Sequence, residues 1–287
     1  MEFYIIEAML GAFMFGIGGM LFKLNAHAHG DDNFFFFGLY TVGAICFLID
    51  GYEELGDFGG MAYYIMAAIV GLGSAGGNYT FSQGMRLGPA GLTSAFAKAN
   101  IIIVILISSL YYGEVISLSE GLGILFFFAA MAVVNIEVGG SIKETSGKWF
   151  LILLACILLL AFRNGGLKVA NEMALSGVLV VAFAYIYCAV YFAAALIKTR
   201  GQSKVPTETR KKSLIYGSSC GFVSFGGLYF YVTALKTGPG GVIVTIFSLD
   251  MFFILIMSYI FFGERLNRNQ KIGFALSAIG LVLIGLK

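Results

Sequence analysis

The fold is decided by residues 71–114, GLGSAGGNYTFSQGMRLGPAGLTSAFAKANIIIVILISSLYYGE, because this stretch occurs a second time. Shifted by 150 positions, it aligns without a gap to residues 221–264, GFVSFGGLYFYVTALKTGPGGVIVTIFSLDMFFILIMSYIFFGE. The identities concentrate on glycine, proline and glutamate, which do not interchange freely with apolar residues. They include Gly76-Gly77 with Gly226-Gly227, Gly88-Pro89 with Gly238-Pro239, and Gly113-Glu114 with Gly263-Glu264. Such self-similarity indicates an internal duplication.

The composition of the chain is that of a membrane protein. Its 287 residues are 59% hydrophobic and 12% charged, with a mean hydropathy of +0.89, whereas a soluble protein needs more polar surface. Apolar runs of about 20 residues, long enough to cross ~30 Å of hydrocarbon, fill most of the length. Backbone polar groups in lipid must be satisfied within each segment, and no segments alternate with the period of barrel strands. The predicted fold class is therefore an all-α membrane protein.

Turn and polar clusters divide the chain into ten predicted transmembrane helices. These are residues 3–24, 34–50, 61–85, 91–112, 118–138, 149–172, 177–198, 213–236, 241–262 and 271–286. The first five form a repeat over residues 1–138, a linker covers 139–148, and the second five form a repeat over 149–287. Because five is an odd number, the two repeats must cross the membrane in opposite senses. This is the inverted-repeat plan of many secondary transporters.

The charge of the loops predicts an orientation, because Lys and Arg accumulate on the cytoplasmic side. The loops after predicted helices 1, 3, 5, 7 and 9 hold most of the basic residues: Arg86, Lys143, Lys148, Lys198, Arg200, Lys204, Arg210, Lys211, Lys212, Arg265, Arg268 and Lys271. The other face has Lys236 and Lys287, together with an acidic loop containing Glu53, Glu54 and Asp57. This count places both termini outside the cell.

Several classes of function are disfavoured. The net charge is only +2, and no basic run is interleaved with aromatic residues, so no nucleic-acid partner is expected. The cysteines lack the close spacing of a metal or redox motif: Cys46, Cys156, Cys188 and Cys220. His27 and His29 with Asp31 and Asp32 are more often solvated in such a polar turn than metal-bound. Neither a metal nor a cofactor is expected, and the lack of buried histidines and of a carboxylate or cysteine cluster argues against an enzyme.

A family resemblance rests on short motifs spread over nearly the full chain. The first helix carries Gly16, Gly18, Gly19 and Lys23. Each repeat then uses a Gly-Pro turn, an apolar helix, Gly-Glu, and a further helix with Gly123 or Gly273. The pattern resembles the ten-helix, duplicated (EamA-like) branch of the drug/metabolite transporter superfamily. The resemblance implies a secondary transporter with both termini in the cytoplasm, which is the reverse of the orientation from loop charge.

Two departures from the family pattern bear on function. A proline commonly found early in helices 4 and 9 is replaced by Asn100 and Asp250. The related four-helix multidrug exporters carry a glutamate in helix 1, eight residues before a lysine. Counting back from Lys23 gives Phe15, and Glu7 lies too early to replace that glutamate. The resemblance therefore disfavours polyspecific export of cationic drugs.

Embedded charged residues are the leading candidates for a substrate site, because each costs at least ~2.5–3.5 kcal/mol in a bilayer and needs a cavity or a partner. They are Lys98, Arg163 and Asp250, and Asn100 is the repeat counterpart of Asp250. In one interpretation they line a central cavity, where an anionic group meets Lys98 or Arg163 and an amino group meets Asp250. In the other, Lys98 or Arg163 neutralises Asp250 in a structural bridge that no substrate touches.

Two uncharged residues complete the candidate substrate-binding set. Asn78 in predicted helix 3 offers donors and an acceptor, and the ring of Tyr229 in predicted helix 8 can hold an ammonium group. Both residues fit interhelical contacts equally well. Lys23 and Lys168 lie late in helices 1 and 6, where their long side chains are expected to reach the headgroups.

The sequence thus favours a secondary transporter in the plasma (inner) membrane that moves a small charged or zwitterionic organic metabolite by alternating access. Amino-acid-like solutes fit a cavity with both signs of charge, and organic anions fit if Asp250 is neutralised elsewhere. A polyspecific drug or cation exporter and a non-transporting membrane scaffold remain as alternatives. The expected partners are the small-molecule substrate and the lipid bilayer, while a coupling proton or cation and a homodimer are left open.

Overall fold

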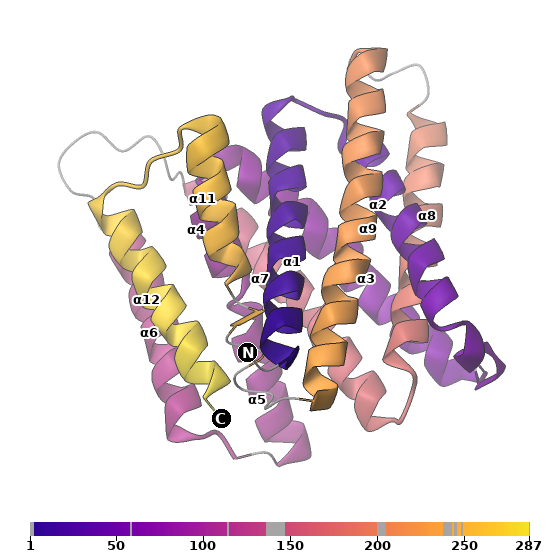
Figure 1. Ribbon diagram of the computed structural model, residues 1–287, viewed down its shortest axis with the longest axis horizontal. Coiled ribbons are helices and arrows are strands. Elements are labelled where there is room, and N and C mark those ends of the chain that lie inside the picture. Colours follow the sequence, from indigo (N-terminus) through magenta and orange to yellow (C-terminus); the bar gives the residue numbers. More distant parts are fainter. Residues whose placement is uncertain are drawn as a thin grey trace.

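The computed structural model describes residues 3–57, 59–113, 115–135, 147–199, 205–237, 243, 246–247 and 249–286, and all regular elements among them are helices (Figure 1). Their bounds are α1 Phe3–His27, α2 Asp32–Asp50, the 3-10 helix η1 Tyr52–Asp57, α3 Met61–Leu87, α4 Ala90–Ala97, α5 Asn100–Tyr112, α6 Leu118–Asn135, α7 Gly147–Glu172, α8 Gly177–Lys198, α9 Thr207–Thr237, α11 Asp250–Phe262 and α12 Arg268–Gly285. The predicted all-helical class is confirmed.

Five segments of the described chain are long and apolar enough to cross a membrane. They are Phe3–His27, Asp32–Asp50, Ala90–Tyr112, Gly147–Glu172 and Gly177–Lys198, and two shorter apolar helices cover Leu118–Ala130 and Asp250–Phe262. The chain is therefore a multi-pass membrane protein, while the number of ten crossings stays a prediction. The repeat bounds also stay a prediction, and most of the predicted linker, together with Glu114, lies outside the described residues.

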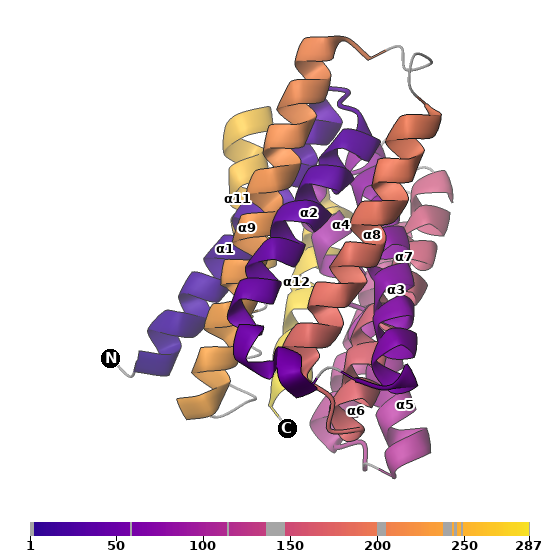
Figure 2. The same ribbon diagram turned by 90° about the vertical axis from the view of Figure 1, so that its right-hand side faces the viewer.

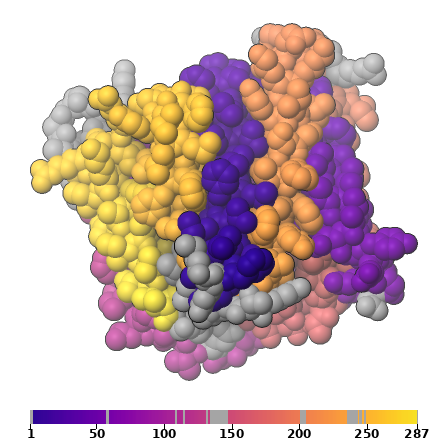
Figure 3. Space-filling view, in the orientation of Figure 1, coloured from indigo at the N-terminus to yellow at the C-terminus, as the bar shows by residue number. Residues whose placement is uncertain are grey.

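The helices of the two halves interlock in a symmetric pattern (Figure 1). If α1, α2 and α3 are matched in chain order with α7, α8 and α9, the most extensive contacts among these six helices have counterparts. Thus α3 packs on α7 as α1 packs on α9, and α3 packs on α8 as α9 packs on α2. Figure 2 shows α8 in the layer with α2 and α3, and Figure 3 shows α1 flanked by α9 and α11. Helices before residue 135 thus pack mainly against helices after residue 147.

Small residues allow the closest helix crossings. At Gly217 of α9, any Cβ would collide with the carbonyl group of Phe35 in α2. Phe35 and its neighbour Phe36 are fully buried, so the start of α2 is a packed aromatic core rather than a lipid-facing segment. Such close backbone approach is typical of membrane helices, whose association depends on packing rather than on the hydrophobic effect.

Predicted helix 91–112 is not continuous, which corrects the sequence analysis. It is interrupted between α4 and α5, where the amide nitrogens of Ala99 and Ile102 donate to carbonyls three residues back, each at 3.0 Å. The same two bonds occur 150 positions later, from Leu249 at 3.0 Å and from Phe252 at 2.9 Å. We call the interruption between α4 and α5, and the start of α11 at Leu249 and Asp250, the helix breaks.

A side chain explains the first helix break. Nδ2 of Asn100 donates to the carbonyl oxygen of Ala97 at 2.5 Å, whereas the amide nitrogen of Ile101, the usual helical donor, bonds to Lys98 instead. An asparagine side chain that competes for backbone acceptors in this way opens a helix locally.

Both termini lie at one end of the bundle, opposite the start of α9 (Figures 1 and 2). At the opposite end α1 turns into α2, and α8, α9 and α12 place their terminal basic residues there. We call it the basic end. Its described cations include Arg86, Lys148, Lys198, Arg210, Lys211, Lys212, Arg265, Arg268 and Lys271.

Candidate functional site

The two helix breaks meet at an ion pair between Lys98 and Asp250. Lys98 is the C-cap of α4 and Asp250 is the first residue of α11, and their Nζ and Oδ2 atoms lie 2.7 Å apart. The Asp250 side chain is 5% exposed and that of Lys98 22% exposed. Each charge lies at the helix end whose dipole favours it, a cation at a C-terminus and an anion at an N-terminus. Oδ1 of Asp250 is buried and has no hydrogen-bond partner.

Asn100 and Asn164 extend this polar layer toward α7. Nδ2 of Asn164 donates to Oδ1 of Asn100 at 2.6 Å, so both ends of the Asn100 side chain are occupied. Asn164 is the neighbour of Arg163 in α7. Three of the predicted substrate-binding residues, Lys98, Asn100 and Asp250, therefore lie at the helix breaks. Arg163 precedes Asn164, which contacts Asn100.

Arg163 has no ionic partner among the described residues. It is partly buried, its Nε atom has no hydrogen-bond partner, and none of the ion pairs in the described ranges includes it. At 1.5 Å per residue it lies ~24 Å from the start of α7 and ~14 Å from the end of that helix. This depth is inside the hydrocarbon core of a bilayer.

The other two predicted binding residues do not join the helix breaks. Nδ2 of Asn78 donates to the hydroxyl of Tyr40 at 3.1 Å, and this hydroxyl donates to the carbonyl of Ser74 at 2.7 Å. Asn78 thus connects α3 with α2. The Tyr229 side chain is 47% exposed, and its ring contacts Phe225 and Phe230 of the same helix.

A second polar cluster, at the basic end, escaped the sequence analysis. Lys23 forms an ion pair with Glu264 and donates to the carbonyl of Met85 at 2.9 Å. Oε2 of Glu264 accepts from the backbone amide of Ala90 at 3.0 Å and from the hydroxyl of Ser258. The expectation that Lys23 reaches the headgroups is wrong, because it is buried where α1, α3 and α11 meet. Lys168 instead pairs with Glu172 near the end of α7.

Asp32 accepts hydrogen bonds from several other polar side chains at this end of the bundle. Its Oδ1 accepts from Arg86 at 2.7 Å and from Asn25 at 3.1 Å, and its Oδ2 accepts from Gln83 at 2.9 Å. Arg86 also donates to the carbonyl of Gly30 at 3.1 Å. The described residues contain no group of three metal-ligating side chains there or elsewhere. We call Lys23, Asp32, Arg86 and Glu264 the basic-end clamp, because they join the ends of α1, α3 and α11 to the starts of α2 and α4.

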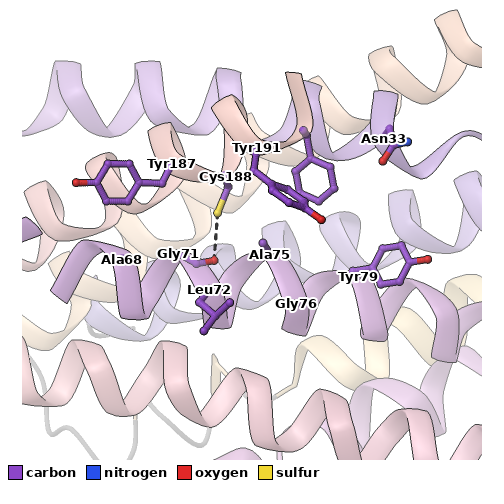
Figure 4. Close-up of a pocket in the computed structure, with 11 residues that line it drawn as sticks. Asn33, Ala68, Gly71, Leu72, Ala75, Gly76, Tyr79, Tyr187, Cys188 and Tyr191 are labelled. Carbon is purple, nitrogen blue, oxygen red and sulfur yellow. Dashed lines mark hydrogen bonds between the residues drawn. The ribbon is translucent and has the colours of Figure 1, made fainter. Parts of the chain in front are cut away.

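A lateral groove of about 580 Å³ lies between α3 and α8 (Figure 4). Tyr79, Tyr187 and Tyr191 line it, and Sγ of Cys188 crosses it to the carbonyl of Gly71 at 3.2 Å. Leu72 and Tyr191 are both exposed on the outer side of the two helices, and the lining contains no charged side chain. The groove is thus apolar and separate from the helix breaks.

Comparison with known proteins identifies the kind of molecule. The profile of the EamA-like transporter family matches residues 2–136 and again 147–286. A protein from Archaeoglobus fulgidus named "Uncharacterized transporter" is 24% identical over 240 residues, 80% of each chain. An "Uncharacterized transporter in cobO 3'region" from Sinorhizobium sp is 26% identical over 91 residues, 32% of this chain and 64% of that one.

Two further matches are to a protein that is not named a transporter and to a solved structure. The chain is 29% identical over 310 aligned positions to NADH-quinone oxidoreductase subunit N of Campylobacter fetus, matching 98% of its own length but only 60% of that protein. A solved crystal structure matches 96% of this chain and 97% of its own with a TM-score of 0.59 at 15% identity. At that identity the second similarity concerns the fold alone.

Proposed function

The chain belongs to the EamA-like transporter family and is a membrane transporter, and from this premise we propose that it is a secondary transporter that moves a small charged or zwitterionic organic metabolite by alternating access. Its substrate site lies at the helix breaks. No catalysis is part of the proposal.

The ion pair between Lys98 and Asp250 is the observation that carries this proposal. It joins one break of each half, deep in the bundle, and it combines a partly exposed cation with an almost fully buried anion. Discontinuous helices that meet near the midplane are a recurrent way to build a transport site, since the freed helix ends supply dipoles and polar groups. A charged substrate can exchange with one member of such a pair.

The basic-end clamp supports the alternating-access part of the proposal. Glu264 belongs to the second half, whereas Lys23 and the amide of Ala90 belong to the first half. Opening this end requires that these contacts separate, and the charges become stable again once water reaches them. In the present conformation the clamp is closed.

The binding residues are tested by uptake into proteoliposomes, first with amino acids, amines, organic acids and sugar phosphates chosen from a thermal-shift screen. Asp250→Asn and Lys98→Ala should each abolish uptake of the substrate that the screen identifies. Unchanged uptake in both variants would show that the site is elsewhere. Failure of the wild-type protein to move any of these solutes would favour a scaffold role.

The basic end is proposed to face the cytoplasm, with both termini outside, because cationic loops remain on the cytoplasmic side. The exposed Glu208 at the start of α9 and Glu53 of η1 lie at opposite ends of the bundle. In a cysteine-free background, an impermeant maleimide added to whole cells should label Glu53→Cys but not Glu208→Cys. The reverse labelling would place both termini in the cytoplasm.

A further inference from the structure

The lateral groove between α3 and α8 has no part in the transport site proposed above. Its volume of about 580 Å³ is in the range of small-ligand pockets, and its lining carries no charged side chain. Leu72, Tyr79 and Tyr191 are exposed along it. In α8, 39% of the most apolar window is buried within the protein, so much of this membrane span faces outward. The groove therefore opens toward the lipid.

The polar groups of the groove gather at one of its ends. Figure 4 shows Asn33 and Tyr79 at the end that lies away from Ala68 and Tyr187. Asn33 is the second residue of α2, which starts at the basic end of the bundle. Among the described residues, the side-chain amide of Asn33 has no hydrogen-bond partner. The polar end of the groove thus faces the basic end.

The length of the groove matches one leaflet of a bilayer. Ala68 and Tyr79 lie ~16 Å apart along α3 at 1.5 Å per residue. This distance is about half of the ~30 Å thickness of the hydrocarbon core. An acyl chain that enters at the polar end can therefore lie along the groove without leaving its own leaflet.

An exposed cation lies just beyond the polar end. The bond from Sγ of Cys188 to the carbonyl of Gly71, at 3.2 Å, sets the depth of α8 relative to α3. From this contact, Tyr79 lies ~12 Å and Lys198 ~15 Å further toward the basic end. Lys198 is exposed, and none of the ion pairs among the described residues includes it. Its long side chain extends the charge toward the headgroups.

The groove is thus apolar along its length, polar at one end and followed by a positive charge. A phospholipid with an anionic headgroup presents the complementary order of acyl chain, ester oxygens and phosphate. Tyrosine is a residue type that favours the headgroup level, and the hydroxyls of Tyr79 and Tyr191 suit the ester oxygens. Basic residues between transmembrane helices bind anionic headgroups.

We propose that the groove between α3 and α8 binds an anionic phospholipid, with an acyl chain along the groove, the ester groups at Asn33 and Tyr79, and the phosphate at Lys198. The bound lipid would contact one helix of each half. This inference goes beyond the transport function and does not depend on it, because the groove is separate from the helix breaks.

Binding is measured by native mass spectrometry of the full-length protein, released from micelles that contain phosphatidylglycerol and phosphatidylcholine at equal concentration. The wild type should retain one phosphatidylglycerol molecule with about fivefold preference. Lys198→Gln should lose this preference, because one basic residue contributes about fivefold to the attraction of an anionic lipid. Lys271→Gln is the matched control, since Lys271 is an exposed lysine at the basic end on α12, which packs on α6 and α4.

Filling the groove should weaken the binding of both lipids. Ala75→Phe places a ring in the middle of the groove and should lower the affinity at least about tenfold, because several methylene groups lose their contact. Ala68→Phe shortens the groove at its exposed far end and should lower the affinity several-fold, which keeps the test valid if Ala75→Phe does not fold. Ala129→Phe on the exposed face of α6 is the matched control and should bind as the wild type does.

Equal retention of the two lipids by the wild type overturns the proposal, and so does unchanged retention in Ala68→Phe and Ala75→Phe. A protein dimer that dissociates in Ala68→Phe, without retained lipid, also overturns it and assigns the groove to a second copy of this chain. None of these measurements involves flux, so a protein that moves no solute in proteoliposomes still tests the lipid site.

Discussion

Asp250 at the start of α11 lies 2.7 Å from Lys98 at the end of α4, so each helix break supplies one charge of the same pair. The two residues are 152 positions apart in the chain. The helix dipoles favour both charges where they lie, which lowers the cost of keeping them inside the bundle. The pair therefore joins the end of α4 to the start of α11 inside the bundle.

Replacing both members of this pair by apolar residues separates its structural role from its transport role. Lys98→Met alone leaves the Asp250 carboxylate buried without a partner and should lower the free energy of unfolding by ~3–5 kcal/mol. The double variant with Asp250→Leu should regain most of that stability, because it removes both charges. Uptake should be absent in both variants, as measured in proteoliposomes. Wild-type uptake in the double variant would show that the pair is a structural bridge.

Glu264→Gln tests the basic-end clamp. The amide oxygen of Gln can still accept from Ala90, but Lys23 loses its anionic partner, so this end should open more often. Met85, which is fully buried beside Lys23, is the reporter when changed to Cys in a protein lacking its native cysteines. Its alkylation by a maleimide should be several-fold faster with Glu264→Gln.

Glu208→Gln is the control for this change, because Glu208 forms only an exposed pair with Lys211 at 3.4 Å and such pairs contribute little. Equal alkylation rates in Glu264→Gln and Glu208→Gln would mean that the clamp does not control access.

The class of fold could be predicted from the sequence. The apolar composition indicates membrane helices, and the repeated glycines mark the internal duplication. The sequence was insufficient for the helix breaks. Residues 91–112 are almost uniformly apolar, and the signal lay in Asn100 alone, whose side chain takes the carbonyl of Ala97. Asn100 replaces a proline of the family pattern, and its side chain interrupts the helix by competing for a backbone acceptor.

The ion pairs of the site join residues that are far apart in the sequence, so they could not be predicted from it. Asp250 was recognised as a group that needs a partner, but sequence spacing cannot choose between Lys98 and Arg163. The structure pairs Asp250 with Lys98 and leaves Arg163 without an ionic partner among the described residues. The sequence predicts that Lys23 reaches the headgroups, because nothing local in the chain indicates that it meets Glu264 at the end of α11.

Gly73→Ala should be strongly destabilising. The new methyl group would meet the backbone of Arg163 and the carbonyl of Leu159, so α3 and α7 would have to separate at a cost of ~1–3 kcal/mol. Gly121→Ala in α6 is the matched control, since no atom lies within 4 Å of its Cβ, and it should be neutral or stabilising by up to ~1 kcal/mol. Thermal unfolding of both variants in the same detergent checks this, and equal unfolding temperatures would contradict the close crossing.

Asn100→Ala should partly restore helical backbone hydrogen bonding at the first helix break. The carbonyl of Ala97 is then free to accept from the amide of Ile101, and alanine has a higher helix propensity than asparagine by up to ~0.7 kcal/mol. Amide hydrogen exchange of residues 99–103 should slow, while uptake falls because the end of α4 no longer presents Lys98 in the same direction. Asn164→Ala removes the same 2.6 Å contact with Asn100 but leaves its bond to Ala97, so exchange there should not slow. Slower exchange in Asn164→Ala as well would assign the break to the contact between α5 and α7 rather than to the local competition for a backbone acceptor.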